Sequence, residues 1–233
     1  MAKRKRRSKT RKPELVRRDG ALCAAFVNTA TPRRRPLVTY ADLLAWGKRA
    51  GELSAADAER LARAAAERPA EAEAVVARAE EARLLVERIL LALAENRHPA
   101  VADLDAFNAE LGAALSARRV VRDGDAYRWA WSDGEELDRV LWPVLLSVAD
   151  LLASEHRRRV RQCGAEDCSV LFVDRTSGSP RKWCDRKTCG HRTRALKYYH
   201  SKVKPRRGRR RKKRARRELR RKEESGEPEE PAS

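Results

Sequence analysis

Two pairs of cysteines constrain the fold of this chain more than any other feature of its sequence. Cys163 and Cys168 are separated by four residues, as are Cys184 and Cys189, and fifteen residues lie between the pairs. Zinc takes four ligands in a tetrahedron. Two closely spaced thiol pairs, separated by a segment long enough for a strand, a loop and a second strand, are typical of a structural zinc site. The sequence therefore predicts that these four cysteines bind Zn²⁺.

The sequence leaves other uses of the four cysteines open. An iron–sulfur cluster also uses four cysteines. A catalytic zinc is the other alternative, but it keeps one position open for water, and four thiolates would fill that position. Disulfides require an oxidising compartment. The N-terminal residues lack the apolar region of a secretion signal, so we expect a cytoplasmic location. Cys23 lies in an apolar segment, where a buried, inert thiol is expected.

The residues around the cysteines predict a compact finger over residues 157–201. A hairpin is expected between the two pairs: a strand carries Val170 and Phe172 on one face, a turn follows at residues 177–180, and a second strand returns to Cys184. Asp185 is a candidate cap for a helix over about 186–200, on which His191 points away from the metal. Because a module of about 45 residues buries too little apolar surface to fold well alone, metal binding would supply the missing free energy.

The residues before the finger predict a mainly helical body with one hairpin, over residues 19–156. Apolar residues recur at helical spacing, and Asp123-Gly124 is a strong hairpin signal. Tyr127, Trp129 and Trp131 alternate, which puts them on one face, although core packing is expected for the body's tryptophans. Pro143 either kinks the last helix or marks its real start. We expect helices over residues 39–50, 54–68, 70–97, 103–117 and 135–158.

The finger resembles the CGNR-type zinc finger of bacterial proteins. The matching residues are Cys163, Cys168, Trp183, Cys184, Cys189, Gly190 and Arg192. His191 stands where that family usually has Asn. The segment from residue 21, with Asn28-Thr29 and a Leu-Leu-x-Trp helix, is similar to the ABATE domain that normally precedes this finger. The resemblance covers roughly residues 20–200 and implies a treble-clef-like finger in a stress-response transcriptional regulator.

Charge is distributed unevenly along the chain, whose formal net charge is +20. Residues 1–18 hold ten Lys or Arg and one acid, and residues 202–233 hold fifteen and six. The body sums to −6 and the finger to +8. Because dense like charge repels itself, both tails are expected to be disordered. A basic module next to a basic tail favours contact with nucleic acid. The candidate contacts are Arg175, Arg181, Lys182, Arg186, Lys187, Arg192, Arg194, Lys197, Arg209, Arg210, Arg211, Lys212, Lys213 and Arg214.

Three classes of function compete. The sequence favours a nucleoid-associated, DNA-binding regulator whose body senses a signal or forms a homodimer. An RNA- or ribosome-associated zinc protein is the alternative, because basic tails also suit folded RNA. An enzyme is least expected, since no nucleophile–base pattern or Gly-rich phosphate loop is present. The sequence has no run of about 18 apolar residues, so it does not predict a membrane span.

Overall fold

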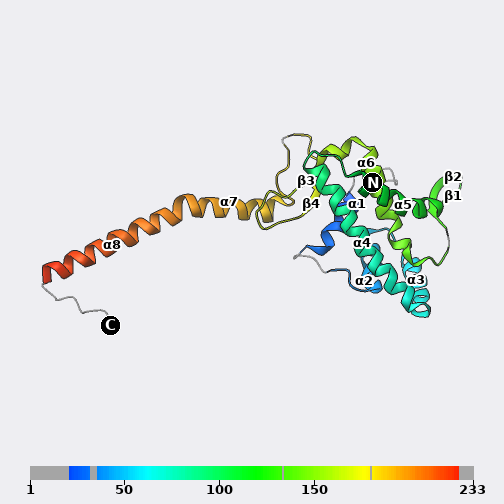
Figure 1. Cartoon of the computed structure of the whole chain (residues 1–233), viewed down its shortest axis with the longest axis horizontal. Helices are drawn as coiled ribbons and strands as arrows, with labels where there is room; N and C mark the ends of the chain where they lie inside the picture. The colour runs from blue at the N-terminus through cyan, green and yellow to red at the C-terminus, as the bar shows by residue number, and fades with distance from the viewer. Residues whose placement is uncertain (1–20, 32–35, 133, 179, 226–233) are drawn as a thin grey trace, which may run out of the picture. The chain divides into compact units, whose positions relative to one another are not determined.

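The computed structural model describes residues 21–31, 36–132, 134–178 and 180–225 (Figure 1). The predicted basic arm 1–18 and residues 226–233 lie outside the described residues. The described fold is mainly α, with two short antiparallel hairpins, which confirms the predicted fold class. Contacts divide the chain into two compact units, Met1–Cys184 and Asp185–Ser233. Within the described part of the chain, no helix has the length and apolar character needed to cross a membrane.

The first unit contains six α-helices and two hairpins in its described residues. The helices are α1 (Ala21–Val27), α2 (Tyr40–Ala50), α3 (Ala55–Glu67), α4 (Pro69–Ala94), α5 (Val101–Ser116) and α6 (Trp142–Ala153). The strands are β1 (Arg118–Asp123), β2 (Ala126–Trp131), β3 (Val160–Gln162) and β4 (Leu171–Val173). Short 3₁₀ turns follow at Asn28–Ala30, Leu137–Val140 and Glu155–Arg159.

Local signals decide where most of these helices begin and end. Thr39 and Asp42 form a capping box at the start of α2, which ends at Gly51 with a φ of 76°. Ser54 caps α3. The helix predicted from residue 135 instead begins at Trp142. Pro143 lacks an N–H and is tolerated only in the first turn of a helix, so it marks the real start.

Helix α4 forms the centre of the core of the first unit. It contacts α1, α2, α3 and α5, and Figure 1 shows it running between them. Its predicted stripe is buried: Val75, Ala79, Ala82, Val86, Ile89 and Leu93. On α5, Phe107 and Ala114 are buried, but Leu115 is exposed. Residues 107, 111 and 114 share one helical face, and position 115 turns away from it.

The β1–β2 hairpin differs from its prediction by one residue. Asp123 pairs with Ala126, so the turn residues are Gly124 and Asp125. Gly124 takes the positive φ of 66° that this turn requires. Trp131 packs on the buried Trp142, with ring centroids 5.4 Å apart.

A partly buried ion pair connects α3 with the residues before α6. Arg139 Nη1 lies 3.0 Å from Asp57 Oδ1, and the Arg139 side chain is buried. Burial acts to raise the pKa of Asp57, but hydrogen bonding to Ser54 and the charge of Arg139 outweigh it and lower the pKa below its usual value. Asp57 therefore stabilises the fold in its ionised form.

The second unit is helical over almost all of its described residues. Two five-residue π-helical turns, Arg186–Gly190 and Tyr199–Val203, precede α7 (His191–Tyr198) and α8 (Lys204–Ser225) respectively. The tail expected to be disordered is thus helical over α8. Arg, Lys and Glu are good helix formers, and over α8 this propensity outweighs the repulsion between like charges. Pro205 is the second residue of α8 and follows the π-helical turn directly.

Candidate metal centre

The four predicted cysteines form one cluster. Their sulfur atoms all lie within 4.8 Å of one another, and Cys163 and Cys189 are buried. Cys168 Sγ and Cys184 Sγ are 3.8 Å apart. In a tetrahedron with zinc–sulfur bonds of about 2.3 Å, neighbouring sulfurs lie about 3.8 Å apart, whereas a disulfide joins them at about 2.05 Å. None of the five cysteines forms a disulfide, and Cys23 is buried apart from the cluster. The geometry fits a tetrahedral metal ion and excludes a disulfide frame here.

Strands β3 and β4 hold the first cysteine pair. The ladder between them continues past the strand ends, where Cys163 N donates to the Val170 carbonyl at 2.9 Å. Cys168 N then donates to the Ala165 carbonyl at 3.0 Å, which closes the turn between the two thiols. The hairpin therefore surrounds the first pair. The prediction of a hairpin between the two pairs is wrong, because the described residues from 174 to 184 form no strand.

Asp174 organises the loop that leads to the second cysteine pair. Its buried carboxylate accepts hydrogen bonds from Thr176 N at 3.0 Å, Thr176 Oγ1 at 2.7 Å and Arg181 N at 2.8 Å. Burial acts to raise the pKa of Asp174, but these donors outweigh it and lower the pKa. The backbone of this loop thus bonds to a side chain instead of a strand, which explains why no second strand forms. The Asp-x-Thr sequence is a local signal for such a turn.

The return segment brings a backbone donor to the first thiol pair. Gly164 N donates to the Lys182 carbonyl at 2.9 Å, and Cys184 N points at Cys163 Sγ at 3.4 Å. Burial acts to raise the pKa of Cys163, but backbone N–H donors at Cys184 and Ala165 outweigh it and lower the pKa. This environment favours the thiolate, which is the form that binds a metal.

The last cysteine is positioned by a capped helical turn. Asp185 Oδ1 accepts a hydrogen bond from Thr188 N at 2.6 Å, as expected for the predicted cap, and Gly190 N donates to the Asp185 carbonyl at 3.0 Å. Arg192 Nη2 lies 3.8 Å from Cys189 Sγ. A guanidinium next to a thiolate offsets the negative charge that four thiolates place on a divalent ion. His191 is exposed.

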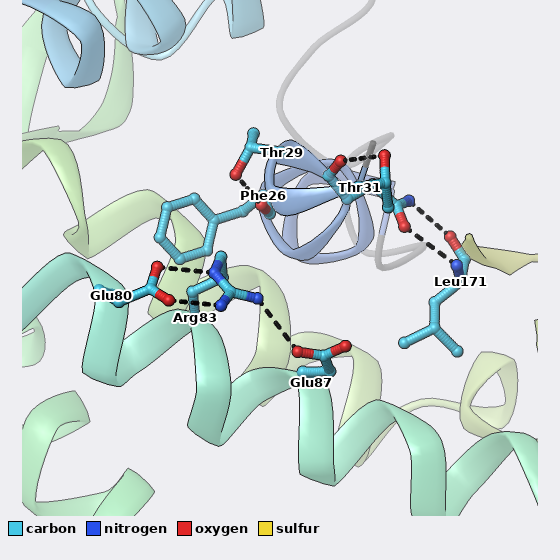
Figure 2. A network of polar contacts seen from close by, with 8 residues as sticks. Phe26, Thr29, Thr31, Glu80, Arg83, Glu87 and Leu171 are labelled. Carbon is cyan, nitrogen blue, oxygen red and sulfur yellow. Dashed lines mark hydrogen bonds and ion pairs between the residues drawn. The ribbon is translucent and has the colours of Figure 1, made fainter. Parts of the chain in front are cut away.

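Asn28, which follows α1, attaches the finger's hairpin to the helical body. Its Nδ2 donates to the Leu171 carbonyl at 2.7 Å, and its Oδ1 accepts from Leu171 N at 3.0 Å. Figure 2 shows this pair of bonds at the edge of β4. Val160, Leu171 and Val173 are buried in the same apolar core as α1 and α4. In the sequence, Asn28 stands out only in the Asn28-Thr29 pair of the ABATE-like segment, and no local pattern reveals its partner 143 positions away.

Helix α1, which precedes Asn28, packs on α4. Phe26 is buried in the core, and Figure 2 shows its ring beside Arg83. Arg83 Nη2 lies 2.5 Å from Glu80 Oε1, and Arg83 Nη1 lies 3.0 Å from Glu87 Oε2. These ion pairs satisfy the buried guanidinium along α4, next to the Phe26 ring.

The predicted nucleic-acid contacts fall into two groups. Arg192 is directed at Cys189, and Arg181 donates to the Trp183 carbonyl at 2.8 Å and lies over the Phe172 ring. These two arginines support the finger itself. Arg181 is nevertheless exposed, as are the remaining described side chains: Arg175, Lys182, Arg186, Lys187, Arg194, Lys197, Arg210, Arg211, Lys212, Lys213 and Arg214. The side chain of Arg209 lies outside the described residues.

A helical domain attached to a four-cysteine finger defines the class of protein. The family model described as "ABATE: Putative stress-induced transcription regulator" matches residues 20–155, and the CGNR zinc finger model matches residues 159–202. The first match covers more than half of the chain, which therefore belongs to the ABATE family, with a CGNR zinc finger after it. None of the curated proteins matches the chain. The finger family and the sulfur cluster together point to a bound metal ion.

Proposed function

We propose that the chain is a zinc-containing transcriptional regulator that contacts DNA through its finger and basic C-terminal helix. Cys163, Cys168, Cys184 and Cys189 would hold the Zn²⁺. A zinc ion saturated by four thiolates has no open position for water or substrate, so its role is to fix the fold of the finger. The proposal accordingly assigns no catalytic role to the metal.

One observation carries the DNA-binding proposal. Residues 186–217 contain seventeen Lys or Arg and no Asp or Glu. The described cations of α7 and α8 are exposed apart from the half-buried Arg192. Cations that displace counterions from phosphates give strong, salt-dependent affinity for nucleic acids. Helix α8, with 22 residues, spans about 33 Å, close to one turn of a DNA duplex.

The charge of the metal site does not cancel this surface. Residues 157–201 carry a formal +8, and four thiolates around Zn²⁺ contribute about −2. The finger therefore keeps a positive charge of about +6. The body sums to −6, so a polyanion would be attracted to the finger and repelled by the body.

The experiment compares two variants with the same change in charge. The double variant R194A/K197A removes two exposed cations of α7, and the control R49A/R63A removes two exposed cations of the body. Binding of the full chain to random duplex DNA is measured by fluorescence anisotropy over a series of salt concentrations. We expect R194A/K197A to reduce the slope of log K against log salt by about 2 and the control to leave it unchanged.

Two outcomes would contradict the proposal. Equal effects of the two double variants would show that only total charge matters. Stronger binding of a structured RNA than of duplex DNA, with the same response to R194A/K197A, would favour an RNA-associated protein instead.

A further inference from the structure

The β1–β2 hairpin presents an exposed face of aromatic and arginine side chains on the helical body. Residues that pair across an antiparallel ladder lie on the same side of the sheet. The register pairs Arg118 with Trp131, Val120 with Trp129, and Arg122 with Tyr127. We call these six side chains the aromatic face: Arg118, Val120, Arg122, Tyr127, Trp129 and Trp131.

The side chains of the aromatic face become more exposed toward the turn of the hairpin. Trp131 packs on Trp142 and anchors the hairpin to the core. Toward the turn, Trp129 is 52% exposed, Val120 59% and Tyr127 75%. Large aromatic side chains exposed together on a rigid strand cost hydration free energy, and contiguous patches of this kind mark interaction sites.

Charge indicates what kind of partner fits. Residues 118–131 hold four Arg and two Asp, a local +2 on a body that sums to −6. The Arg118 guanidinium lies 5.2 Å from the Trp129 ring centroid and 4.8 Å from that of Trp131. A cation on the rings disfavours a second copy of the same face and favours an anionic, planar ligand.

We propose that the aromatic face binds single-stranded nucleic acid by stacking bases on Tyr127, on Trp129 and on the guanidinium of Arg118. Aromatic side chains combined with arginines are the usual elements of single-strand binding surfaces, because every base has a π-face and every nucleotide has a phosphate. The proposal does not rest on DNA binding by the finger.

Strand geometry favours a single strand over a duplex. Tyr127 and Trp129 are two residues apart on one strand, which places them about 6.8 Å apart. Stacked bases in a duplex are separated by about 3.4 Å. Two bases that each contact one ring are therefore unstacked from each other. Figure 1 shows β1–β2 and β3–β4 on different sides of the helices of the first unit, so the aromatic face is separate from the finger's hairpin.

The test uses the full chain in salt high enough to screen the basic tails. Affinities for labelled oligothymidylate, oligouridylate and duplex DNA are compared for wild type, Y127S/W129S, W129F and the opposite-face variant R119A/R128A. We expect Y127S/W129S to weaken binding to one or both single strands at least about fivefold per stacked base, and to leave duplex binding unchanged. W129F retains an aromatic ring and should bind nearly as wild type does. R119A/R128A removes charge without removing a ring, so it should change binding by less than about threefold.

Several results would overturn the proposal. Equal loss in Y127S/W129S and R119A/R128A would mean that charge alone acts, and no loss in either would mean that the face binds no strand. A change of oligomeric state in Y127S/W129S, with unchanged single-strand affinity, would identify a protein interface. Thermal unfolding checks that the variants remain folded. R194A/K197A separates the two proposals, because it should weaken duplex binding without removing the difference between wild type and Y127S/W129S on single strands.

Discussion

Replacing Asn28 tests whether the finger depends on the helical body. Leu171 is 1% exposed, so Asn28→Ala leaves a backbone N–H and a backbone carbonyl buried without their partner. A buried group that loses its hydrogen bond costs about 1–3 kcal/mol. Because Asn28 is half-buried and water can relieve part of this cost, we expect a loss of about 2–4 kcal/mol in the free energy of unfolding. For a chain of this size that lowers the Tm by about 4–16 °C.

The same change should weaken metal retention. Folding of the β3–β4 hairpin and metal binding are linked, so about 2 kcal/mol lost from the hairpin reduces the apparent zinc affinity by up to about 30-fold. Competition with a chromogenic chelator measures this affinity, and thermal unfolding followed by circular dichroism measures stability. Asn28→Asp keeps the acceptor but loses the donor, so its defect should shrink as the pH falls toward about 4 and the carboxyl becomes protonated.

A matched control is available in the same turn. Thr31 Oγ1 donates to the Asn28 carbonyl at 2.8 Å, a local bond shown in Figure 2, and Thr31→Val removes it without affecting Leu171. We expect this variant to lose less than about 1.5 kcal/mol. If Asn28→Ala unfolds within about 2 °C of the wild type and retains zinc equally well, the two hydrogen bonds contribute nothing and apolar packing alone holds the hairpin.

Three further predictions concern the thiols, one carboxylate and one guanidinium. Cys184→Ser should abolish stoichiometric zinc in elemental analysis and unfold the finger, whereas Cys23→Ala should keep the metal. Asp57→Asn should lower stability at pH 7 by about 2 kcal/mol, because Arg139 then lacks its ionised partner. The pKa of Asp57 is lower in the folded than in the unfolded chain, so its stabilisation is complete above the unfolded value of about 3.9 and is lost as the pH falls through the folded value. Denaturant unfolding at several pH values should therefore show the variant and the wild type converging in acid. Arg192→Ala should speed zinc loss to a chelator about tenfold, with Arg192→Lys intermediate, since lysine keeps the charge near Cys189 but lacks the planar fork.

Much of the local structure follows from sequence patterns of short range. Thr39, Ser54 and Asp185 are helix caps, and the stripe on α4 is buried as its spacing predicts. Such features depend on neighbours within a few residues, which sequence alone specifies. The four-cysteine site could also be predicted from short-range patterns, because the two cysteines of each pair are close in sequence and a tetrahedral ion needs four such ligands.

The sequence did not predict features that depend on contacts between side chains that no local pattern relates. Trp129 was expected in the core but is exposed, because Trp131 alone reaches Trp142 and the hairpin extends beyond it. Arg192 Nη2 lies 3.8 Å from Cys189 Sγ, a contact that the sequence did not reveal, and its predicted contact with nucleic acid stays a prediction. The strand expected after residue 180 is absent from the described loop, because the carboxylate of Asp174 takes the hydrogen bonds that a ladder would have used.

The sequence by itself determined most helices of the body, the sulfur set of the finger and the position of the charge. Only the tertiary structure decided that Asn28 holds the edge of β4, that Asp57 neutralises Arg139, and that Tyr127 and Trp129 remain exposed on one face. The physical reason is distance along the chain. Asn28 and Leu171 are 143 positions apart, and Asp57 and Arg139 are 82 apart, so no spacing rule relates them and only the packing of α1, α3 and α4 brings them together.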